Sequence, residues 1–432
     1  MNSTDLIVIG AGPGGCRAAE YAAKQGLKVV IFDGDNVGGT CLNIGCIPTK
    51  TYVHSATFEE ARERMPQVVA QLRSGVESVL AHPNITLVRE KAQFGGQGDR
   101  PHDSGPAPLV LAGGETYTAD NIIIATGSET KWLPIEGVDT DPRVTDSTGL
   151  LNLDTLPRHL CIIGAGVIGM EFASVFHRFG SEVTVIEYLK ECLPALDSDI
   201  AKRLRKLLEK RGITFRMKTA VQSLAGIDAD AILMATGRKP RIQADFACAG
   251  FAYDERNGIA VDENYETSVR GIYAIGDVNG RQMLAHAAEM QAIRAVNHIL
   301  GKHDGIRFDI MPAAIFTEPE AACTGPTEER LKEQGIPYVC KKAFWRANGK
   351  ALAMGETEGM LKLFASPDGL ILGCHAYGAH SADIIQEVSV LMCKGTTTGE
   401  LADMVHIHPT LSEILKDASE GGVKRESPTI RL

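Results

Sequence analysis

Two segments of the chain repeat one pattern of apolar runs, glycines and a terminal acid, and this repetition restricts the fold more than any other feature. The first is DLIVIGAGPGGCRAAEYAAKQGLKVVIFD at 5–33, and the second is HLCIIGAGVIGMEFASVFHRFGSEVTVIE at 159–187. Each segment is typical of strand, glycine turn, helix and strand, and each advances 23 positions from its first glycine to its final acid. The shared positions are Gly10, Gly12, Gly15 and Asp33 in the first segment and Gly164, Gly166, Gly169 and Glu187 in the second.

Each part of this pattern has a physical role in binding a dinucleotide. The first glycine makes a tight turn, the second lets the backbone approach a pyrophosphate, and the third lets helix and strand pack closely. The start of the helix adds N–H donors and a partial positive charge for phosphates. A glycine turn with purely structural duties is the alternative for one copy, but two copies in phase indicate two dinucleotide sites.

The acid at the end of the second copy indicates which nucleotide binds there. Glu187 would accept hydrogen bonds from a free ribose 2′-hydroxyl and would repel a 2′-phosphate. No arginine follows it directly in IEYLKE. The second site is therefore predicted to prefer NAD to NADP.

Each unit is followed by an apolar run that ends at Thr-Gly, NIIIATGS at 121–128 and AILMATGR at 231–238. Such runs predict buried parallel strands whose carboxyl ends lie where open α/β sheets bind ligands. We therefore expect an α/β protein with two Rossmann-like dinucleotide-binding domains in tandem.

A pair of cysteines with unusual spacing lies in GGTCLNIGCIPTK at 38–50. Cys41 and Cys46 are five positions apart, which matches neither zinc ligands nor C-x-x-C redox pairs, and no metal site is expected. In a regular helix their Cα atoms would be about 8.7 Å apart, beyond the reach of a disulfide. Bridging them requires a bent or broken helix, which Gly45 and Pro48 would permit. Two unrelated core cysteines are the alternative.

Composition excludes several classes of function. The 44 Lys and Arg against 54 Asp and Glu give a net charge of −10, which disfavours nucleic acid and anionic membranes as partners. No apolar run approaches a membrane span, and the first predicted strand leaves no room for a signal or transit peptide. Ten cysteines, eight of them scattered and expected to be small buried hydrophobes, fit a reducing cytoplasm. The tail at 421–432 is expected to be mobile.

Together these motifs resemble the flavoprotein disulfide reductases, a family of class I pyridine nucleotide-disulfide oxidoreductases, and most closely its dihydrolipoamide dehydrogenases. The resemblance spans essentially the whole chain, and its cysteine motif and HPTLSE are highly specific. The segments that carry it are GAGPGG, GGTCLNIGCIPTK, GAGVIGMEFAS, ATGRKP, GIYAIGDV, MLAHAAE, FTEPEAACTG, NGKALAMGETEG and HIHPTLSE.

The resemblance implies FAD at the first dinucleotide site and NAD at the second. The FAD residues would be Gly10, Gly12, Gly15, Asp33, Gly39, Thr40, Lys50, Ala92, Thr126, Gly127, Asp277, Met283, Leu284 and Ala285. The NAD residues would be Gly164, Gly166, Val167, Ile168, Gly169, Glu187 and Gly237. Lys50 would lie close to the flavin and pair with Glu171, which on its own would pass as a solvated helix carboxylate.

The segment HPTLSE can also be interpreted physically. Pro409 is expected to be the first residue of a helix through LSEILKDA, with His408 just before it. Glu413 would hold one imidazole nitrogen and leave the other free as a base. The resemblance implies that this dyad is the family's acid and base, whereas His406 is expected to be an ordinary surface histidine.

The resemblance also implies a domain order and a partner. Residues 1–144 would bind FAD, 145–261 would bind NAD, 262–309 would return to the FAD domain, and 310–432 would form an α+β dimerisation domain. In a homodimer, His408 would complete the other subunit's site. The reaction would be oxidation of dihydrolipoamide by NAD⁺ through a redox-active Cys41–Cys46 disulfide, in EC class 1.8.1. The lipoyl group would belong to a 2-oxo acid dehydrogenase or glycine cleavage complex.

Two departures and three alternatives accompany this resemblance. One helical segment, FEEARERMPQVVAQLRSGVESVL, fills a region where relatives have more chain, and TAVQSLAGIDADAILMATG lacks room for a usual β-hairpin. An NAD(P)H-dependent reductase of another disulfide such as glutathione is the main alternative. A mercuric reductase is disfavoured because no cysteine lies beyond Cys393. A docking subunit of a multienzyme complex is the third.

Overall fold

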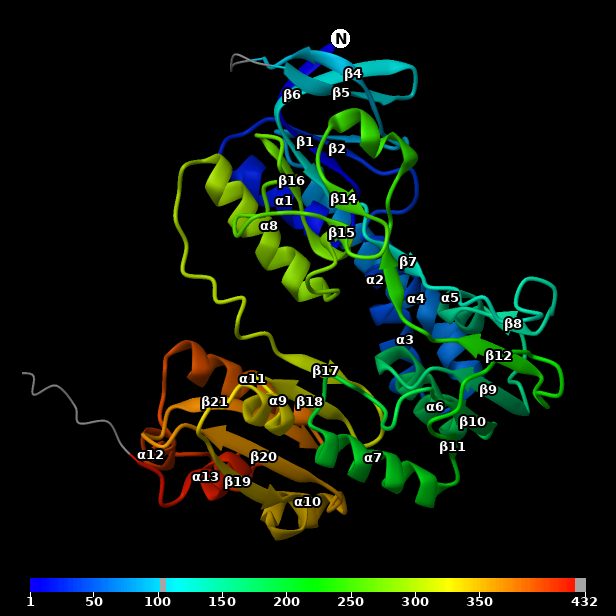
Figure 1. Ribbon diagram of the computed structural model, residues 1–432, viewed down its shortest axis with the longest axis vertical. Helices are drawn as coiled ribbons and strands as arrows, with labels where there is room; N and C mark the ends of the chain where they lie inside the picture. Colours follow the sequence, from blue (N-terminus) through cyan, green and yellow to red (C-terminus); the bar gives the residue numbers. More distant parts are fainter. Residues whose placement is uncertain (102–105, 424–432) are drawn as a thin grey trace, which may run out of the picture. The chain divides into compact units, whose positions relative to one another are not determined.

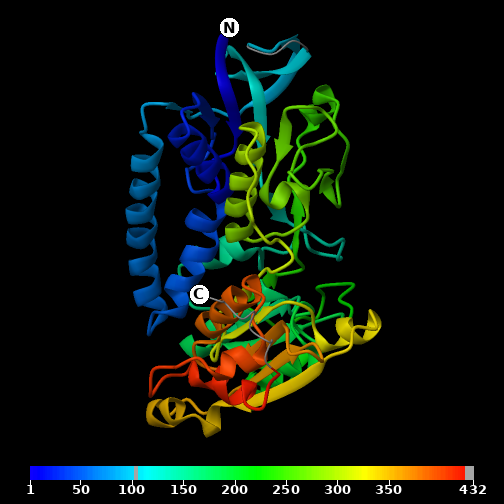
Figure 2. The same cartoon turned by 90° about the vertical axis from the view of Figure 1, so that its left-hand side faces the viewer.

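The computed structural model describes residues 1–101 and 106–423, which form two compact units (Figures 1 and 2). Unit 1 comprises residues 1–133, 146–153 and 236–306, and unit 2 comprises residues 134–145, 154–235 and the chain from 307 onward. Most of the tail that was expected to be mobile, residues 424–432, lies outside the described residues. Within those residues, no helix has the length and apolar character needed to cross a membrane.

Unit 1 is built on a seven-stranded sheet in the order β3-β2-β1-β6-β5-β4, with β16 also paired to β6. The pairs β1–β2, β1–β6, β2–β3 and β6–β16 are parallel, and β4 and β5 form an antiparallel extension. The strands are β1 (Asn2–Ile9), β2 (Val29–Phe32), β3 (Ile85–Val88), β4 (Gln93–Asp99), β5 (Pro106–Ala112), β6 (Glu115–Ile124) and β16 (Ile272–Ala274). The strands β1 and β2 of the first glycine-turn segment and the much later strand β16 therefore belong to one sheet.

Helix α1 (Pro13–Lys24) starts at the glycine turn and packs against this sheet and against α8 (Ala285–Ile299). Its buried face consists of glycines and alanines, which allow this close approach. The other helices of unit 1 are α2 (Gly39–Ile44), α3 (Cys46–Val53), α4 (Phe58–Leu80), α5 (Ser147–Leu151) and the short 3₁₀ helices η1 (Ala244–Ala249) and η2 (Gly276–Asn279). Two small antiparallel pairs complete it, β7 (Ser128–Thr130) with β13 (Arg238–Pro240), and β14 (Tyr253–Asp254) with β15 (Gly258–Ile259).

Unit 2 contains a parallel five-stranded sheet in the order β11-β10-β9-β12-β8. Its strands are β8 (Val144–Thr145), β9 (His159–Ile163), β10 (Glu182–Ile186), β11 (Thr214–Arg216) and β12 (Ala231–Met234). Helix α6 (Val167–Phe179) packs on β9 and β10, and α7 (Ser198–Arg211) follows β10. No strand lies in the described stretch 217–230, so the expected lack of a β-hairpin before β12 is confirmed.

The rest of unit 2 is an antiparallel sheet in the order β17-β18-β21-β20-β19. Its strands are β17 (Ala313–Ile315), β18 (Ala321–Thr324), β19 (Val339–Phe344), β20 (Met360–Ala365) and β21 (Ile371–Tyr377). The helices around it are α9 (Glu328–Glu333), α10 (Gly349–Met354), α11 (Ser381–Cys393), α12 (Thr398–Ala402), α13 (Glu413–Ser419) and the 3₁₀ turn η3 (Trp345–Ala347). Its own core includes the fully buried Trp345. The expected α/β class with an α+β C-terminal region is therefore confirmed.

The scattered cysteines differ partly from expectation. Cys161, Cys192, Cys323 and Cys374 are buried, as small apolar residues are. Cys16 and Cys340 are partly buried, whereas Cys248 and Cys393 are exposed. The prediction was wrong for the last two because Cys248 lies in a short 3₁₀ turn and Cys393 ends α11, where one side faces solvent.

Candidate active site

Both glycine turns have the geometry that a pyrophosphate site needs. In unit 1, Gly10 has φ +102°, and a Cβ on Gly15 would lie 1.8 Å from the Gly10 carbonyl oxygen, whereas a Cβ on Gly12 would meet nothing within 4 Å. The backbone therefore requires glycine at positions 10 and 15, whereas at position 12 the absence of a side chain leaves open space above the turn. In unit 2 the corresponding values are φ +109° at Gly164, 2.0 Å at Gly169 and open space at Gly166.

The terminal acids lie directly beside these turns. Asp33 Oδ2 accepts a hydrogen bond from the Ala11 N–H at 2.7 Å, and Glu187 Oε2 accepts one from the Ala165 N–H at 2.6 Å. Each carboxylate is thus fixed at the carboxyl edge of its parallel sheet, next to the open space over the middle glycine. Helices α1 and α6 begin at these turns, so their N–H groups and dipoles favour an anion there. Each of the two sites fits a dinucleotide.

The cysteine segment packs onto the first glycine turn. The Gly38 N–H donates to the Ala11 carbonyl at 2.7 Å, and Gly39 approaches Gly12 so closely that its Cβ would lie 2.7 Å from the Gly12 Cα atom. Thr40 follows within α2. The structure therefore brings the start of GGTCLNIGCIPTK to the first dinucleotide site.

A helix break places the two thiols together. Helix α2 ends at Ile44 and α3 begins at Cys46, with Gly45 between them at φ −137° and ψ −111°. The predicted broken helix is confirmed. The Cys41 and Cys46 thiols are hydrogen-bonded to each other, and this bond, followed by burial, raises the pKa of Cys41 well above its usual range. The Lys50 ammonium opposes that shift, so a cation is near the pair.

Asp277 forms a polar cluster that the sequence did not predict. It lies in η2, accepts a hydrogen bond from the Ser128 hydroxyl, and has a pKa raised by burial. Arg238 donates from Nε to the Ser128 hydroxyl oxygen and from Nη2 to the Ser128 carbonyl, both at 2.7 Å. Burial lowers the pKa of this guanidinium, while the Asp277 charge opposes the shift. Arg238 directly follows Gly237, so the Thr-Gly-Arg ending of the second apolar run was the available signal.

The remaining FAD candidates occupy defined positions in unit 1. Thr126 and Gly127 follow β6, and Gly127 has φ +75°. Ala92 is buried in the core, and Leu284 is the N-cap of α8, with Met283 before it and Ala285 as its first residue. The backbone of α8 therefore presents its N-terminus at the segment MLAHAAE.

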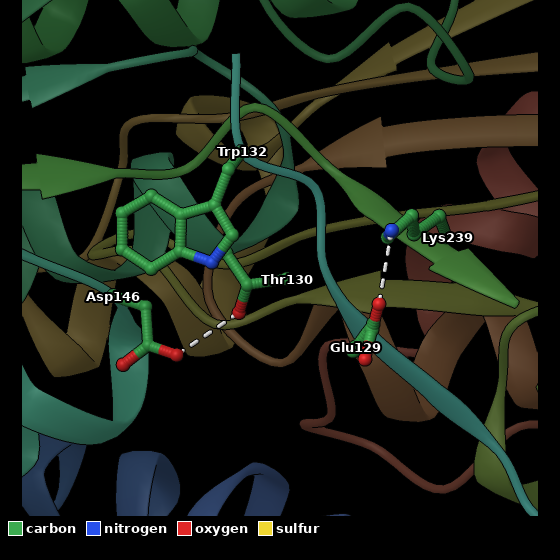
Figure 3. A pocket seen from close by; sticks show the side chains of 5 residues that line it. All are labelled: Glu129, Thr130, Trp132, Asp146 and Lys239. Atoms are coloured by element: carbon green, nitrogen blue, oxygen red, sulfur yellow. Dashed lines mark hydrogen bonds and ion pairs between the residues drawn. The ribbon is translucent and has the colours of Figure 1, made fainter. Parts of the chain in front are cut away.

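A separate pocket of about 320 Å³ in unit 1 is lined by Glu129, Thr130, Trp132, Asp146 and Lys239 (Figure 3). Its polar groups bind one another, because Lys239 pairs with Glu129 at 3.0 Å and the Thr130 hydroxyl donates to Asp146 at 3.0 Å. Asp146 also caps α5 by accepting from the Gly149 N–H. These contacts stabilise the strand β7 and the start of α5. None of the residues that line this pocket was predicted from the sequence to be catalytic.

His408 and Glu413 are in contact in unit 2. His408 Nδ1 lies 2.9 Å from Glu413 Oε1, while Glu413 Oε2 accepts from the Thr410 N–H at 2.9 Å. These two hydrogen bonds, that from Thr410 first, lower the pKa of Glu413. The imidazole is exposed, with Nε2 directed away from this bond.

Two local expectations around this dyad were wrong. The helix begins at Glu413 rather than Pro409, because the Thr410 N–H turns back to the Glu413 carboxylate. His406 is not a surface histidine, since its side chain is only 7% exposed and its Nε2 lies 3.3 Å from Glu387 Oε1.

Glu171 is buried rather than solvated. It lies on the buried face of α6, and its Oε1 accepts a hydrogen bond from the Phe316 N–H at 2.9 Å. A buried carboxylate is stable only when it is hydrogen-bonded or paired with a cation. Glu171 therefore does not lie on a solvated helix face, and its carboxylate is held by the backbone of the segment that contains Phe316.

Comparison with known proteins identifies the family. The family described as "Pyridine nucleotide-disulphide oxidoreductase" matches residues 4–292, and its "dimerisation domain" matches residues 311–419. The chain belongs to the pyridine nucleotide-disulphide oxidoreductases.

Similar proteins cover nearly the whole of this oxidoreductase. A dihydrolipoyl dehydrogenase of Thermus scotoductus is 37% identical over 462 residues, covering 97% of each chain. A leghemoglobin reductase of Glycine max is 34% identical over 462 residues, covering 97% of this chain and 87% of its own. The solved HOCl-induced flavoprotein disulfide reductase RclA from Escherichia coli superposes with a TM-score of 0.88 at 33% identity, covering 96% of this chain and 99% of that one.

The oxidoreductase is accordingly an FAD-dependent dithiol–disulfide oxidoreductase that uses FAD and NAD, and it forms a homodimer through its C-terminal domain. The resemblance seen in the sequence is confirmed at the level of family, fold class and enzyme class.

Proposed function

We propose that this oxidoreductase oxidises dihydrolipoyl groups with NAD⁺ through Cys41 and Cys46. The observation that carries the proposal is the hydrogen-bonded thiol pair at the Gly45 break, on a segment packed against the first glycine turn. Similarity to dihydrolipoyl dehydrogenases over 97% of the chain supports this substrate class. The carrier would be a lipoyl-bearing protein of a 2-oxo acid dehydrogenase or glycine cleavage complex, in the cytoplasm.

The thiol chemistry begins with the Cys41–Cys46 disulfide. His408 of the partner subunit, held at Nδ1 by its glutamate, accepts a proton at Nε2 from one substrate thiol. The resulting thiolate attacks the Cys41 sulfur, the Cys41–Cys46 bond breaks, and Cys46 leaves as a thiolate. The second substrate thiol then attacks its own mixed disulfide, which releases the cyclic substrate disulfide and leaves the enzyme as a dithiol. Bound FAD supplies the two-electron chemistry that re-forms the disulfide and reduces NAD⁺.

The other residues predicted from the sequence would bind and orient the two cofactors, FAD and NAD. Asp33 and the first glycine turn would hold FAD, with Asp277 and the N-terminus of α8 at the same cofactor. Lys50 and Glu171 would form an ion pair beside it. Glu187 and the second glycine turn would hold NAD, and the carboxylate would select against a 2′-phosphate. The domain boundaries at 144, 261 and 309 belong to the same proposal.

A reductase of another small disulfide is the second candidate, favoured by the structural similarity to the Escherichia coli flavoprotein disulfide reductase. The two candidates differ in the substrate that is accepted. Purified FAD-containing protein is assayed anaerobically with dihydrolipoamide and NAD⁺, and with glutathione disulfide and NADH or NADPH. We expect NAD⁺ reduction only with dihydrolipoamide. Turnover of glutathione disulfide without dihydrolipoamide oxidation would establish the second candidate instead.

Two variants test the roles of the residues. Cys46→Ser and His408→Ala are expected to retain FAD but to lose nearly all turnover, because the first lacks the leaving thiolate and the second lacks the base. His303→Ala, which removes an exposed imidazole, is the matched control and should behave like the parent. Parental activity in either of the first two variants contradicts the assignment.

A further inference from the structure

The loop that follows Glu187 is fastened to the second glycine turn. The Leu189 N–H donates to Glu187 Oε1 at 2.7 Å, and the Leu193 N–H donates to the Ala165 carbonyl at 2.9 Å. Residues 188–196 therefore lie against the turn that the Glu187 carboxylate also contacts. The loop ends at Asp197, the N-cap of α7.

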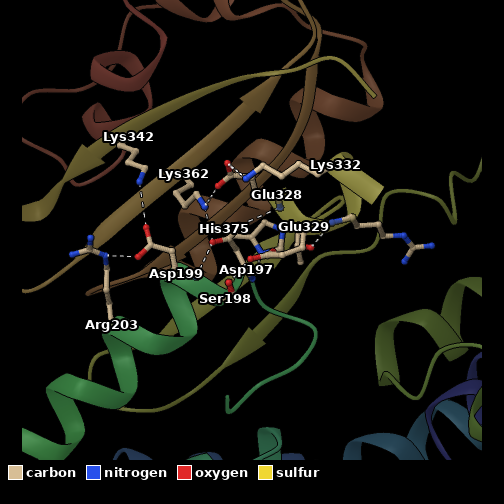
Figure 4. A network of polar contacts seen from close by, with 12 residues as sticks. Asp197, Ser198, Asp199, Arg203, Glu328, Glu329, Lys332, Lys342, Lys362 and His375 are labelled. Carbon is tan, nitrogen blue, oxygen red and sulfur yellow. Dashed lines mark hydrogen bonds and ion pairs between the residues drawn. The ribbon is translucent and has the colours of Figure 1, made fainter. Parts of the chain in front are cut away.

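Asp197 is fixed by the C-terminal region of unit 2 (Figure 4). Its fully buried carboxylate accepts from Lys362 Nζ at 2.7 Å on Oδ1 and from the Glu328 N–H at 3.2 Å on Oδ2. Its own N–H donates to His375 Nδ1 at 2.9 Å. These three partners lie on β20, α9 and β21, outside the second parallel sheet. We name Asp197, Glu328, Lys362 and His375 the Asp197 clamp.

The clamp has little freedom to adopt another arrangement. Lys362, whose side chain is 1% exposed, also contacts Glu328 at 2.6 Å, so one buried ammonium serves two carboxylates. His375 Nε2 lies 3.2 Å from the Pro326 carbonyl, so Nε2 carries the hydrogen and Nδ1 is the acceptor for Asp197. Removing one partner of a buried ion pair leaves an uncompensated charge, so the geometry is strongly determined.

We propose that Lys362, Glu328 and His375 are positioning residues for NAD, which act by fixing Asp197 and thereby the loop that holds Glu187 over the second glycine turn. This inference rests on the proposed function, in which Glu187 binds the ribose of NAD. It makes nucleotide affinity depend on the C-terminal dimerisation region, whose sequence contains no G-x-G-x-x-G motif. A clamp that served only folding would leave NAD affinity unchanged in every folded variant.

The test uses Lys362→Met in the full-length, FAD-loaded protein, below its melting temperature. We expect the dissociation constant for NAD⁺, measured by calorimetry, to rise at least about tenfold, because displacement of binding groups by about 1 Å has large effects. KM for NAD⁺ should rise while anaerobic reduction of the enzyme by dithiol, which needs no NAD⁺, stays at the parental rate. The matched control is Lys342→Met, which removes a 43% exposed lysine paired with Asp199 at 3.2 Å and should change neither quantity.

Two further variants distinguish a failure of the clamp's proposed role from a failure of the proposed NAD site. Glu328→Gln keeps the backbone N–H to Asp197 and weakens the side-chain contacts with Lys362, Lys332 and Tyr338, of which only Lys362 belongs to the clamp. It serves if Lys362→Met does not fold, with a smaller expected rise in the dissociation constant. Unchanged NAD⁺ affinity in a folded clamp variant overturns the inference. Glu187→Gln tests the underlying site: if NAD⁺ affinity is unchanged there too, the proposed NAD site fails, whereas a loss there alone refutes only the clamp's role.

Discussion

Among single residues, Gly45 determines how the two thiols meet. A Cβ at this position would lie 2.8 Å from the Thr40 carbonyl oxygen, within the turn that joins α2 to α3. Without the break, Cys41 and Cys46 would lie on one helix at a separation too long for a disulfide. The residue between the two helices is therefore as important for thiol chemistry as the cysteines.

We expect Gly45→Ala to shift the α2–α3 junction and to slow or prevent disulfide formation, because the methyl group meets backbone rather than a flexible side chain. Thiol titration of the oxidised protein should then find two more reactive thiols than in the parent. Gly75→Ala in α4 is the control, since its Cβ would meet nothing within 4 Å, and it should add up to about 1 kcal/mol of stability. Complete oxidation of Cys41 and Cys46 in Gly45→Ala would contradict this prediction.

In the second glycine turn, one glycine is needed for folding and another for nucleotide binding, and single substitutions distinguish the two roles. Gly169→Ala places a methyl group 2.0 Å from the Gly164 carbonyl oxygen and should destabilise unit 2 by a few kcal/mol, on the order of other overpacked sites. Gly166→Ala meets nothing within 4 Å, so the protein should fold normally yet bind NAD⁺ more weakly, since its Cβ occupies space for the pyrophosphate. Melting curves and NAD⁺ titrations of both variants check this, and equal NAD⁺ affinity of Gly166→Ala and the parent would contradict it.

At the level of elements, sequence patterns predicted those parts that local rules control. The two strand–turn–helix units, the parallel strands β6 and β12, and the break at Gly45 all follow from apolar periodicity and glycine placement. The start of α13 did not, because Thr410 finds its hydrogen-bond partner in a side chain three residues on.

Contacts between distant parts of the chain could not be predicted either. His406 contacts Glu387 in α11, and the Asp197 clamp joins residues 197, 328, 362 and 375. No local sequence pattern relates the members of either group. The pairing of Asp277 with Ser128 likewise requires the fold. Local periodicity predicts elements, whereas these side-chain partners are set by which strands and helices become neighbours.

The buried histidine of β21 predicts how stability depends on pH. Burial lowers the pKa of His375 to about 4, with the Asp197 charge opposing and Lys362 adding to the shift. The folded protein thus holds His375 neutral where the unfolded chain binds a proton, so its contribution is complete above about pH 6.5 and is lost as pH falls toward 4. The unfolding free energy should decline by on the order of 1–3 kcal/mol across this window.

Urea unfolding between pH 7.5 and 4.5 measures this decline. His375→Asn keeps an acceptor near the Asp197 N–H but cannot titrate, so its stability should be lower at pH 7.5 and should depend less on pH. His303→Asn, at an exposed position, should retain the parental pH dependence. An equally steep pH dependence in His375→Asn and the parent would show that another group is responsible.

At the scale of the whole molecule, one loop of the dimerisation domain carries exposed apolar side chains. Val405 is 99% exposed and Ile407 is 79% exposed in the single chain, directly beside His408. These two highly exposed, branched apolar residues lie within the dimerisation domain and are expected to be covered by the second subunit.

We expect Ile407→Asp to shift the dimer toward monomer and to lower activity most at low protein concentration, because a charge replaces apolar contact. Sedimentation velocity across a dilution series, with activity assayed on the same samples, measures both effects. Leu72→Asp on α4, where the apolar residue is 41% exposed, is the control and should remain dimeric. A stable dimer of Ile407→Asp would place the subunit contact elsewhere.

The Asp197 clamp bears on how this protein can be recombined with its relatives. A chimera that exchanges only the segment 145–261 would join a foreign helix N-cap to the native lysine and histidine of the C-terminal sheet and the native glutamate of α9. Shuffling experiments should therefore succeed more often when both pieces come from the same parent. We expect the segment that carries the second glycine turn to exchange poorly when it is moved alone.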